Sequence, residues 1–121
     1  MAACAVPDGF DSLGSSPLVA PHLMWSEARS ALHELKWRGE IAASQAESMR
    51  LRLEGCPVEP TIHPQLGPEA WRVADELGWA KVYDAEYVAL ARLLGCRLVT
   101  VDSRLRRGAD RLGFVVAPHE L

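Results

Sequence analysis

Three acidic residues stand where the sequence pattern predicts the start or the end of a buried element. Asp84 opens the apolar stretch within VYDAEYVALA, Asp102 directly follows the hydrophobic run RLVTV, and Glu27 lies near the start of a predicted helix, just off its apolar stripe. Clustered carboxylates repel one another, and a hard divalent cation reverses that penalty. Mg²⁺ characteristically uses few carboxylates, several water molecules and a substrate phosphate. These residues could therefore hold a metal ion that acts on a phosphate.

Each acid also has an ordinary structural explanation. Asp84 and Asp102 would serve as helix N-caps, and Glu27 as a solvated residue on a helix surface. A group of arginines near the C-terminus could contact phosphate or could form a solvated helix face: Arg104, Arg106, Arg107 and Arg111. The histidines are scattered and are expected to be structural or surface residues: His22, His33, His63 and His119. No Ser-His-Asp arrangement, P-loop or GxGxxG motif is readable, so nucleotide cofactors have no support.

Length and composition favour one ordinary globular domain. The chain has 121 residues, 49% hydrophobic and 24% charged, and a net charge of −3. That charge argues against nonspecific coating of nucleic acid but leaves room for an enzyme that acts on RNA through a local basic patch. No apolar run reaches the length of a membrane span, and the start lacks a secretory signal. Cys4, Cys56 and Cys96 form no CxxC pair, which favours reduced thiols in a cytoplasmic protein.

Alternation of helical and strand patterns predicts an α/β fold. Residues 1–17, rich in Pro, Gly and Ser, are expected to form a flexible segment, and residues 18–121 one domain. The expected helices are 22–38 closed by Gly39, a second helix capped by Ser44 and running to about Leu53, one within 67–78 that Gly78 ends, and 84–94, which Gly95 ends. The expected strands are 18–20, a short edge strand within 58–63, a continuous buried strand at 97–101, and 114–116.

These strands lack alternation and are interleaved with helices, which indicates a parallel sheet covered on both faces. In open α/β sheets, ligands bind beyond the carboxyl ends of the strands. Asp102 lies at such an end, and helix N-termini could carry Glu27 and Asp84 to the same rim. The three acids are therefore expected to share one site.

The segments APHLMWSEARSALHELKWRGEI and VYDAEYVALARLLGCRLVTVDSRL carry a more specific pattern. The second one reads YDA, an apolar helix, Gly, a strand, T-x-D and then a basic helix start. Both segments resemble PIN-domain ribonucleases, especially VapC-like toxins, and the resemblance runs from about Leu18 to the C-terminus. It implies a three-layer α/β/α fold with a central parallel sheet. By it, Glu27, Asp84 and Asp102 correspond to the family's catalytic, metal-binding acids, and Thr100 would be a polar neighbour of the site.

The resemblance also implies a function. It implies hydrolysis of an RNA phosphodiester that depends on Mg²⁺, with Mn²⁺ as a possible substitute. The protein would be a toxin-type endoribonuclease that a VapB-like antitoxin inhibits, and it would form a homodimer. The cysteines and the lack of a long apolar run add the expectation of a cytoplasmic protein with no membrane partner. Asp84 and its partners would hold the metal ion, and Glu27 would position metal-bound water. Either a second metal site or Asp102 acting on a water molecule would orient the in-line attack.

The N-terminal part departs from the family pattern. Such proteins usually open with a hydrophobic strand that ends in an Asp, followed by roughly two helices, and this chain has too few residues there. An N-terminally truncated fold is therefore expected, with Asp8 or Asp11 as a candidate replacement for the first acid. The alternatives are a start placed too late and a natural remnant that has lost its first strand.

Three functions remain open at this point. The first is an RNA-cleaving toxin kept silent by its antitoxin. The second is a catalytically impaired PIN remnant that still binds an antitoxin or RNA. The third is an unrelated small α/β binding module whose acids are only helix caps. The YDA and T-x-D motifs argue against the third function, and the missing first acid argues for the second.

Overall fold

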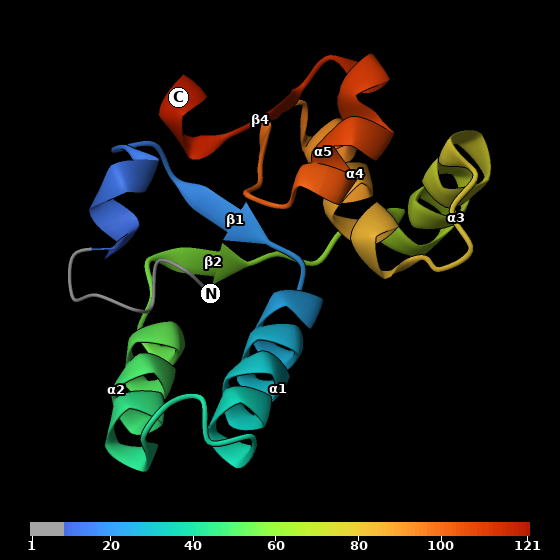
Figure 1. The fold of residues 1–121 in the computed structure, drawn as a ribbon. Coiled ribbons are helices and arrows are strands. Elements are labelled where there is room, and N and C mark those ends of the chain that lie inside the picture. Colours follow the sequence, from blue (N-terminus) through green and yellow to red (C-terminus); the bar gives the residue numbers. More distant parts are fainter. Residues whose placement is uncertain (1–8) are drawn as a thin grey trace. The chain divides into compact units, whose positions relative to one another are not determined.

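A computed structural model describes residues 9–121 and divides into two compact units, with the boundary between Pro60 and Thr61 (Figure 1). We refer to them as the N-terminal unit and the C-terminal unit. Among the described residues, no helix is long and apolar enough to cross a membrane. The structure describes nothing of residues 1–8, so Asp8, Cys4 and the segment ACAVPD lie outside it.

The N-terminal unit is a helix pair beside a two-stranded parallel sheet. Its elements are η2 (Gly9–Leu13), β1 (Leu18–Ala20), α1 (Leu23–Trp37), α2 (Ala43–Glu54) and β2 (Val58–Pro60). Leu18 pairs with Val58 in a parallel register. Helices α1 and α2 lie side by side (Figure 1), and Leu32, Met49 and Leu53 form the buried core between them. Phe10 packs against this core, so part of the segment expected to be flexible contacts the helices.

The C-terminal unit holds a second parallel strand pair and most of the buried core. Leu98 and Val99 pair with Val115 and Val116. Its elements are α3 (Leu66–Leu77), α4 (Tyr83–Leu94), β3 (Leu98–Val99), α5 (Ser103–Ala109), η3 (Asp110–Leu112), β4 (Val115–Val116) and η4 (Pro118–Glu120). Helices and parallel strand pairs together confirm the predicted α/β class.

Small residues let the helices of the C-terminal unit approach closely. Ala85, Val88, Ala89 and Ala109 are fully buried in one cluster, which Leu105 and Val115 complete. Gly78 and Gly95 end α3 and α4 with φ of +72° and +67°, a left-handed conformation in which a side chain would be strained. Both helix ends were predicted from these glycines.

A buried acid ties α3 to α4. Glu69 accepts hydrogen bonds from Arg72 on its own helix and from Arg92 on α4, and Arg92 also pairs with Glu76. Burial alone would lower the pKa of Arg92, but its hydrogen bonds to Glu76 and Glu69 outweigh burial and raise that pKa. The pairing satisfies a carboxylate that would be costly to bury alone. This network is structural.

Two expectations about local structure are wrong. Ser44 does not cap the second helix, because α2 already begins at Ala43 and its N-cap residue Ala42 makes no side-chain capping bond. The strand expected at 97–101 is neither continuous nor buried: only Leu98 and Val99 are assigned to it, and Val101 is 77% exposed. Val101 lies where the chain leaves the strand pair and turns into α5.

Candidate metal and RNA site

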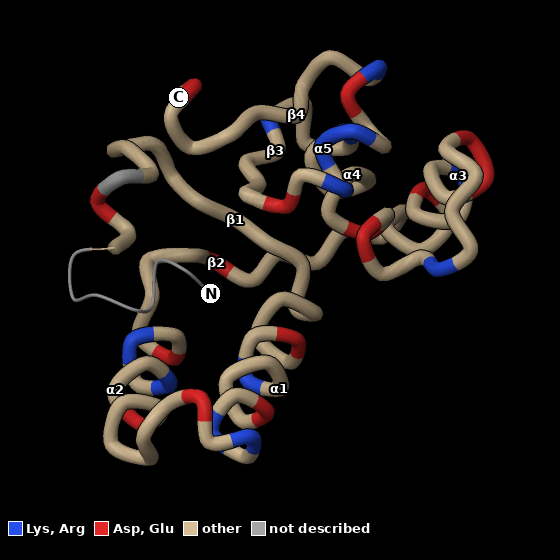
Figure 2. The backbone as a smooth tube through the Cα atoms, viewed as in Figure 1, with Lys and Arg blue, Asp and Glu red and all other residues tan. Residues whose placement is uncertain are grey.

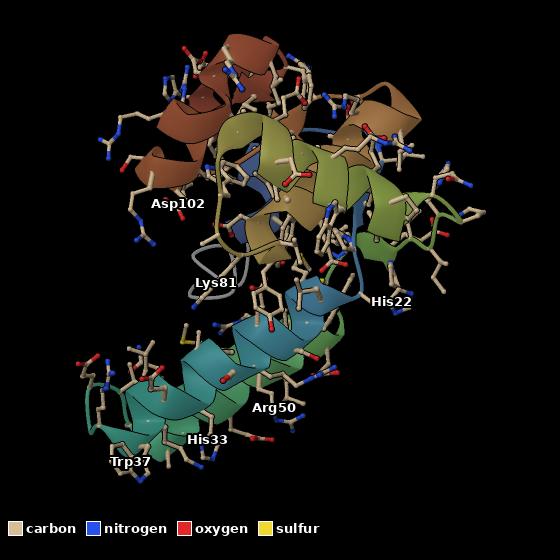
Figure 3. All side chains as sticks on the ribbon, turned by 90° about the vertical axis from the view of Figure 1, so that its right-hand side faces the viewer. His22, His33, Trp37, Arg50, Lys81 and Asp102 are labelled. Atoms are coloured by element: carbon tan, nitrogen blue, oxygen red, sulfur yellow. The ribbon has the colours of Figure 1, made fainter. Side chains whose placement is uncertain are left out.

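Asp102 is the N-cap of α5. Its Oδ1 accepts hydrogen bonds from the backbone N–H groups of Arg104 (2.9 Å) and Leu105 (3.3 Å). Its own N–H donates to Oγ1 of Thr100 (3.0 Å), and the Thr100 N–H donates to the Val116 carbonyl (3.0 Å) in the strand pair. Within the described residues, Oδ2 of Asp102 accepts no hydrogen bond, and 43% of the side chain is exposed (Figure 3). One oxygen thus holds the helix and the other is available.

Asp84 is not a cap. It is the second residue of α4, whose N-cap Val82 makes no side-chain capping bond. The carboxylate is exposed and, in the part of the chain that the structure describes, forms no hydrogen bond or ion pair. A negative charge in a first turn is favourable toward the helix dipole, which accounts for a few tenths of a kcal/mol to about 1 kcal/mol. The capping explanation for Asp84 therefore does not hold.

The turns that carry these two acids border the same core. Ala85 follows Asp84 directly and is fully buried, and Leu105 lies three residues after Asp102. Both belong to the buried cluster of the C-terminal unit. The shared cluster supports the expectation that the two carboxylates lie on one rim, which stays a prediction.

The remaining acid candidates lie in the N-terminal unit. Glu27 is an exposed residue on α1, one residue before Ala28, which packs against the core of that unit. Asp11 is exposed in η2, and Asp8 is not described. A common site for Glu27, Asp84 and Asp102 stays a prediction.

The donors in the C-terminal unit suit a hard divalent cation. Two carboxylates with accessible oxygens, aided by water and phosphate, match the modest demand of Mg²⁺ for protein ligands, and Mn²⁺ accepts the same donors. Across residues 9–121, no group of three or more His, Cys, Asp or Glu side chains is gathered as a metal cluster. The thiols Cys56 and Cys96 are free and would not suit this ion.

The predicted basic patch falls on α5 and η3, where the positively charged positions, all arginines, are drawn in blue (Figure 2). Arg106 pairs with Glu120, and Arg111 donates to the Glu76 carbonyl. The hydrogen bond from Arg106, followed by that from the Ala117 N–H, lowers the pKa of Glu120. Arg104 and Arg107 remain exposed. The four arginines are thus not equivalent.

A groove on the N-terminal unit was not predicted. It runs along α1 and α2, has a volume of about 640 Å³ and is lined by Leu32, His33, Trp37, Ala46 and Arg50 among others (Figure 3). Trp37 is 80% exposed. None of the three candidate acids lines this groove, so it is a candidate contact surface and not the chemical site. The only sequence signal was a tryptophan in the last turn of a helix.

The histidines behave as expected. His63 accepts a hydrogen bond from the Gln65 N–H (3.0 Å) through Nδ1 and so shapes the turn before α3. His22, His33 and His119 are exposed.

Known proteins resemble this chain over most of its length. A family model described as PIN domain matches residues 10–111. A VapC ribonuclease of Mycobacterium bovis is 36% identical over 95 residues, which cover 77% of this chain and 71% of that protein. Ribonuclease VapC9 of Mycobacterium tuberculosis gives the same values. Ribonuclease VapC1 of Mycobacterium tuberculosis is 33% identical over 118 residues, 85% of this chain and 84% of that protein.

Proposed function

We propose that this chain, which belongs to the PIN-domain family and is a VapC-like member of it, is a metal-dependent endoribonuclease controlled by an antitoxin. The reaction is hydrolysis of an RNA phosphodiester. The observation that carries the proposal is Asp84, an exposed carboxylate that caps nothing and precedes the fully buried Ala85. A carboxylate that makes no hydrogen bond and caps nothing, next to a packed core, supports a role in chemistry.

The proposed metal ligands are Glu27, Asp84 and Asp102, with Mg²⁺ as the cofactor and Mn²⁺ as its substitute. A bound ion supplies positive charge for the scissile phosphate and lowers the pKa of a water molecule. The chain supplies orientation, because the two backbone N–H groups that hold Oδ1 of Asp102 also fix the direction of Oδ2. Thr100 restrains the same residue from the other side. Glu27 is proposed to position metal-bound water.

The proposed partners are RNA, a VapB-like antitoxin and a second copy of the chain. Exposed tryptophans support protein contacts, since Trp37 is 80% and Trp71 67% exposed, and tryptophan is enriched at protein interfaces. The proposed location is the cytoplasm, where Cys56 and Cys96 would stay reduced.

A second candidate function is an impaired PIN remnant that binds RNA or an antitoxin without cleaving. The observation that favours it is that Asp102 already caps a helix through two backbone N–H groups, so its presence in the chain does not require catalysis. Family membership removes the third possibility, an unrelated binding module.

The test measures cleavage of single-stranded RNA by the chain, by Asp84→Asn and by Asp75→Asn, with Mg²⁺, with Mn²⁺ and with EDTA. Asp75 is an exposed acid on α3 and serves as the matched control. We expect cleavage with either ion and none in EDTA, a loss of about a hundredfold or more in Asp84→Asn, and parental activity in Asp75→Asn. Parental cleavage by Asp84→Asn would reject the role of Asp84. RNA binding without cleavage by the parent would favour the remnant.

A further inference from the structure

Of the four arginines that follow Asp102, two form side-chain hydrogen bonds with neighbouring elements and two do not. Arg106 pairs with Glu120 of η4, and its pKa is raised chiefly by that hydrogen bond. Arg111 reaches the Glu76 carbonyl at the end of α3. Both side chains therefore join α5 and η3 to neighbouring elements, which limits their freedom to bind another group.

Arg104 and Arg107 differ from them. The side chain of Arg104 is 86% exposed, and its closest ionic contact is a loose one, with Nε 4.0 Å from Oδ1 of Asp102. Arg107 is exposed and forms no ion pair or side-chain hydrogen bond with any residue from 9 to 121. The two lie three residues apart on α5, a spacing that places side chains on one face of a helix.

Two exposed arginines on one helix face, such as Arg104 and Arg107, are suited to bind the phosphates of a nucleic-acid strand. A guanidinium presents planar donors that match phosphate oxygens, and it stays charged at any physiological pH. The pair begins two residues after Asp102, whose carboxylate would otherwise repel an approaching polyanion. No acid of the described chain neutralises Arg107, so its charge is available to a ligand.

We propose that Arg104 and Arg107 bind successive phosphates of the RNA strand beside Asp102, whereas Arg106 and Arg111 maintain the structure and do not touch RNA. The identity of the ligand rests on the proposed function; the division of the four arginines rests on their contacts. The strand then leaves the acids along the outer face of α5.

The experiment uses salt dependence, which counts phosphate contacts. A fluorescent single-stranded RNA is titrated with the full chain in EDTA at several salt concentrations, below the melting temperature of every protein. The variants are Arg104→Gln, Arg107→Gln, Arg106→Gln and Arg111→Gln, so each loses one positive charge. Removing one contact with a single strand reduces the slope of log K against log salt by about 0.7.

We expect Arg104→Gln and Arg107→Gln each to bind about tenfold more weakly and to lose about 0.7 of the slope. Arg106→Gln and Arg111→Gln should keep the parental slope while their melting temperatures fall. Equal slope losses in all four variants would indicate a diffuse positive field and overturn the proposal. Unchanged slopes in the Arg104 and Arg107 variants would also overturn it, as would a parent that binds no RNA.

Cleavage assayed separately with Mg²⁺ distinguishes this proposal from the proposed function. A parent that cleaves RNA, with variants whose slopes are all unchanged, retains the function and loses the arginine assignment. A parent that does not cleave, with the expected pattern of slopes, retains the arginine assignment and loses the nuclease.

Discussion

The first turn of α4 and the first turn of α5 each present an aspartate beside the same buried cluster, but they hold it differently. Asp102 accepts two backbone N–H groups and receives support from Thr100. Asp84 makes no such contact within the described chain. At α5, therefore, one residue combines a structural and a chemical role. At α4 the fold does not need the carboxylate.

This difference separates effects that a single substitution usually mixes. Replacing Asp84 should affect chemistry with little change in stability, since no hydrogen bond is lost and only the interaction with the helix dipole changes. Replacing Asp102 can remove the charge, the cap or both, depending on the residue introduced. The pair of turns thus allows the metal role and the capping role to be measured independently.

The largest expected effect comes from comparing Asp102→Asn with Asp102→Ala. Both should lose about a hundredfold or more of the ribonuclease activity, because both remove the anionic oxygen. Asn caps helices about as well as Asp, so only the Ala variant should lose stability, by about 0.5–2 kcal/mol. Cleavage assays and thermal unfolding measure the two effects. Equal stability of the Asn and Ala variants would show that the capping bonds contribute nothing.

A smaller effect should follow from Gly108→Ala, which tests whether packing also holds the α5 turn. A Cβ at Gly108 would stand 2.9 Å from Cζ2 of Trp79, whose ring packs against the buried cluster. We expect a loss of about 1–3 kcal/mol of unfolding free energy, with activity retained well below the melting temperature. Gly67→Ala is the control, since a Cβ there meets no atom within 4 Å. Equal stability of the Gly108 variant and the parent would contradict this packing.

The smallest effect concerns the ion pair between Arg106 of α5 and Glu120 of η4. The hydrogen bond from Arg106, with that from the Ala117 N–H, lowers the pKa of Glu120 in the folded chain. A carboxyl group whose pKa is lower in the folded chain than in the unfolded chain stabilises the protein at pH values above its unfolded pKa of about 4.3. This stabilisation is lost as the pH falls through the folded pKa. Glu120→Gln should therefore melt slightly lower than the parent at pH 7, and the difference should vanish in acid. A difference that persists at pH 2 would contradict the ion-pair explanation.

The sequence predicts helices better than strands in this chain, for physical reasons. The helix expected at 22–38 is α1 at Leu23–Trp37, and Gly78 and Gly95 mark helix ends as expected. Helix periodicity and glycine caps are local signals. The run RLVTV became only a two-residue strand because strand length depends on a partner, and β4 offers only Val115 and Val116.

The site was predicted in outline only. The T-x-D and YDA motifs locate Asp102 and Asp84. In the sequence both residues look like possible helix caps, and only the contacts in the structure show that Asp102 is a cap and Asp84 is not. The arginines show the same limit, because Glu120 lies 14 residues from Arg106, and Glu76 lies 35 residues from Arg111. Pairings over such separations follow from the tertiary fold and have no local signal.

Mn²⁺ binding followed by electron paramagnetic resonance tests most directly whether Asp84 and Asp102 share one metal site. The proteins are the parent, Asp84→Asn, Asp102→Asn, the double variant and the Asp75→Asn control. We predict that each single variant at the site binds Mn²⁺ at least about tenfold more weakly, and that the double variant loses much less than the product of the two. Parental Mn²⁺ affinity in either single variant, or losses that multiply as for independent sites, would contradict a shared site.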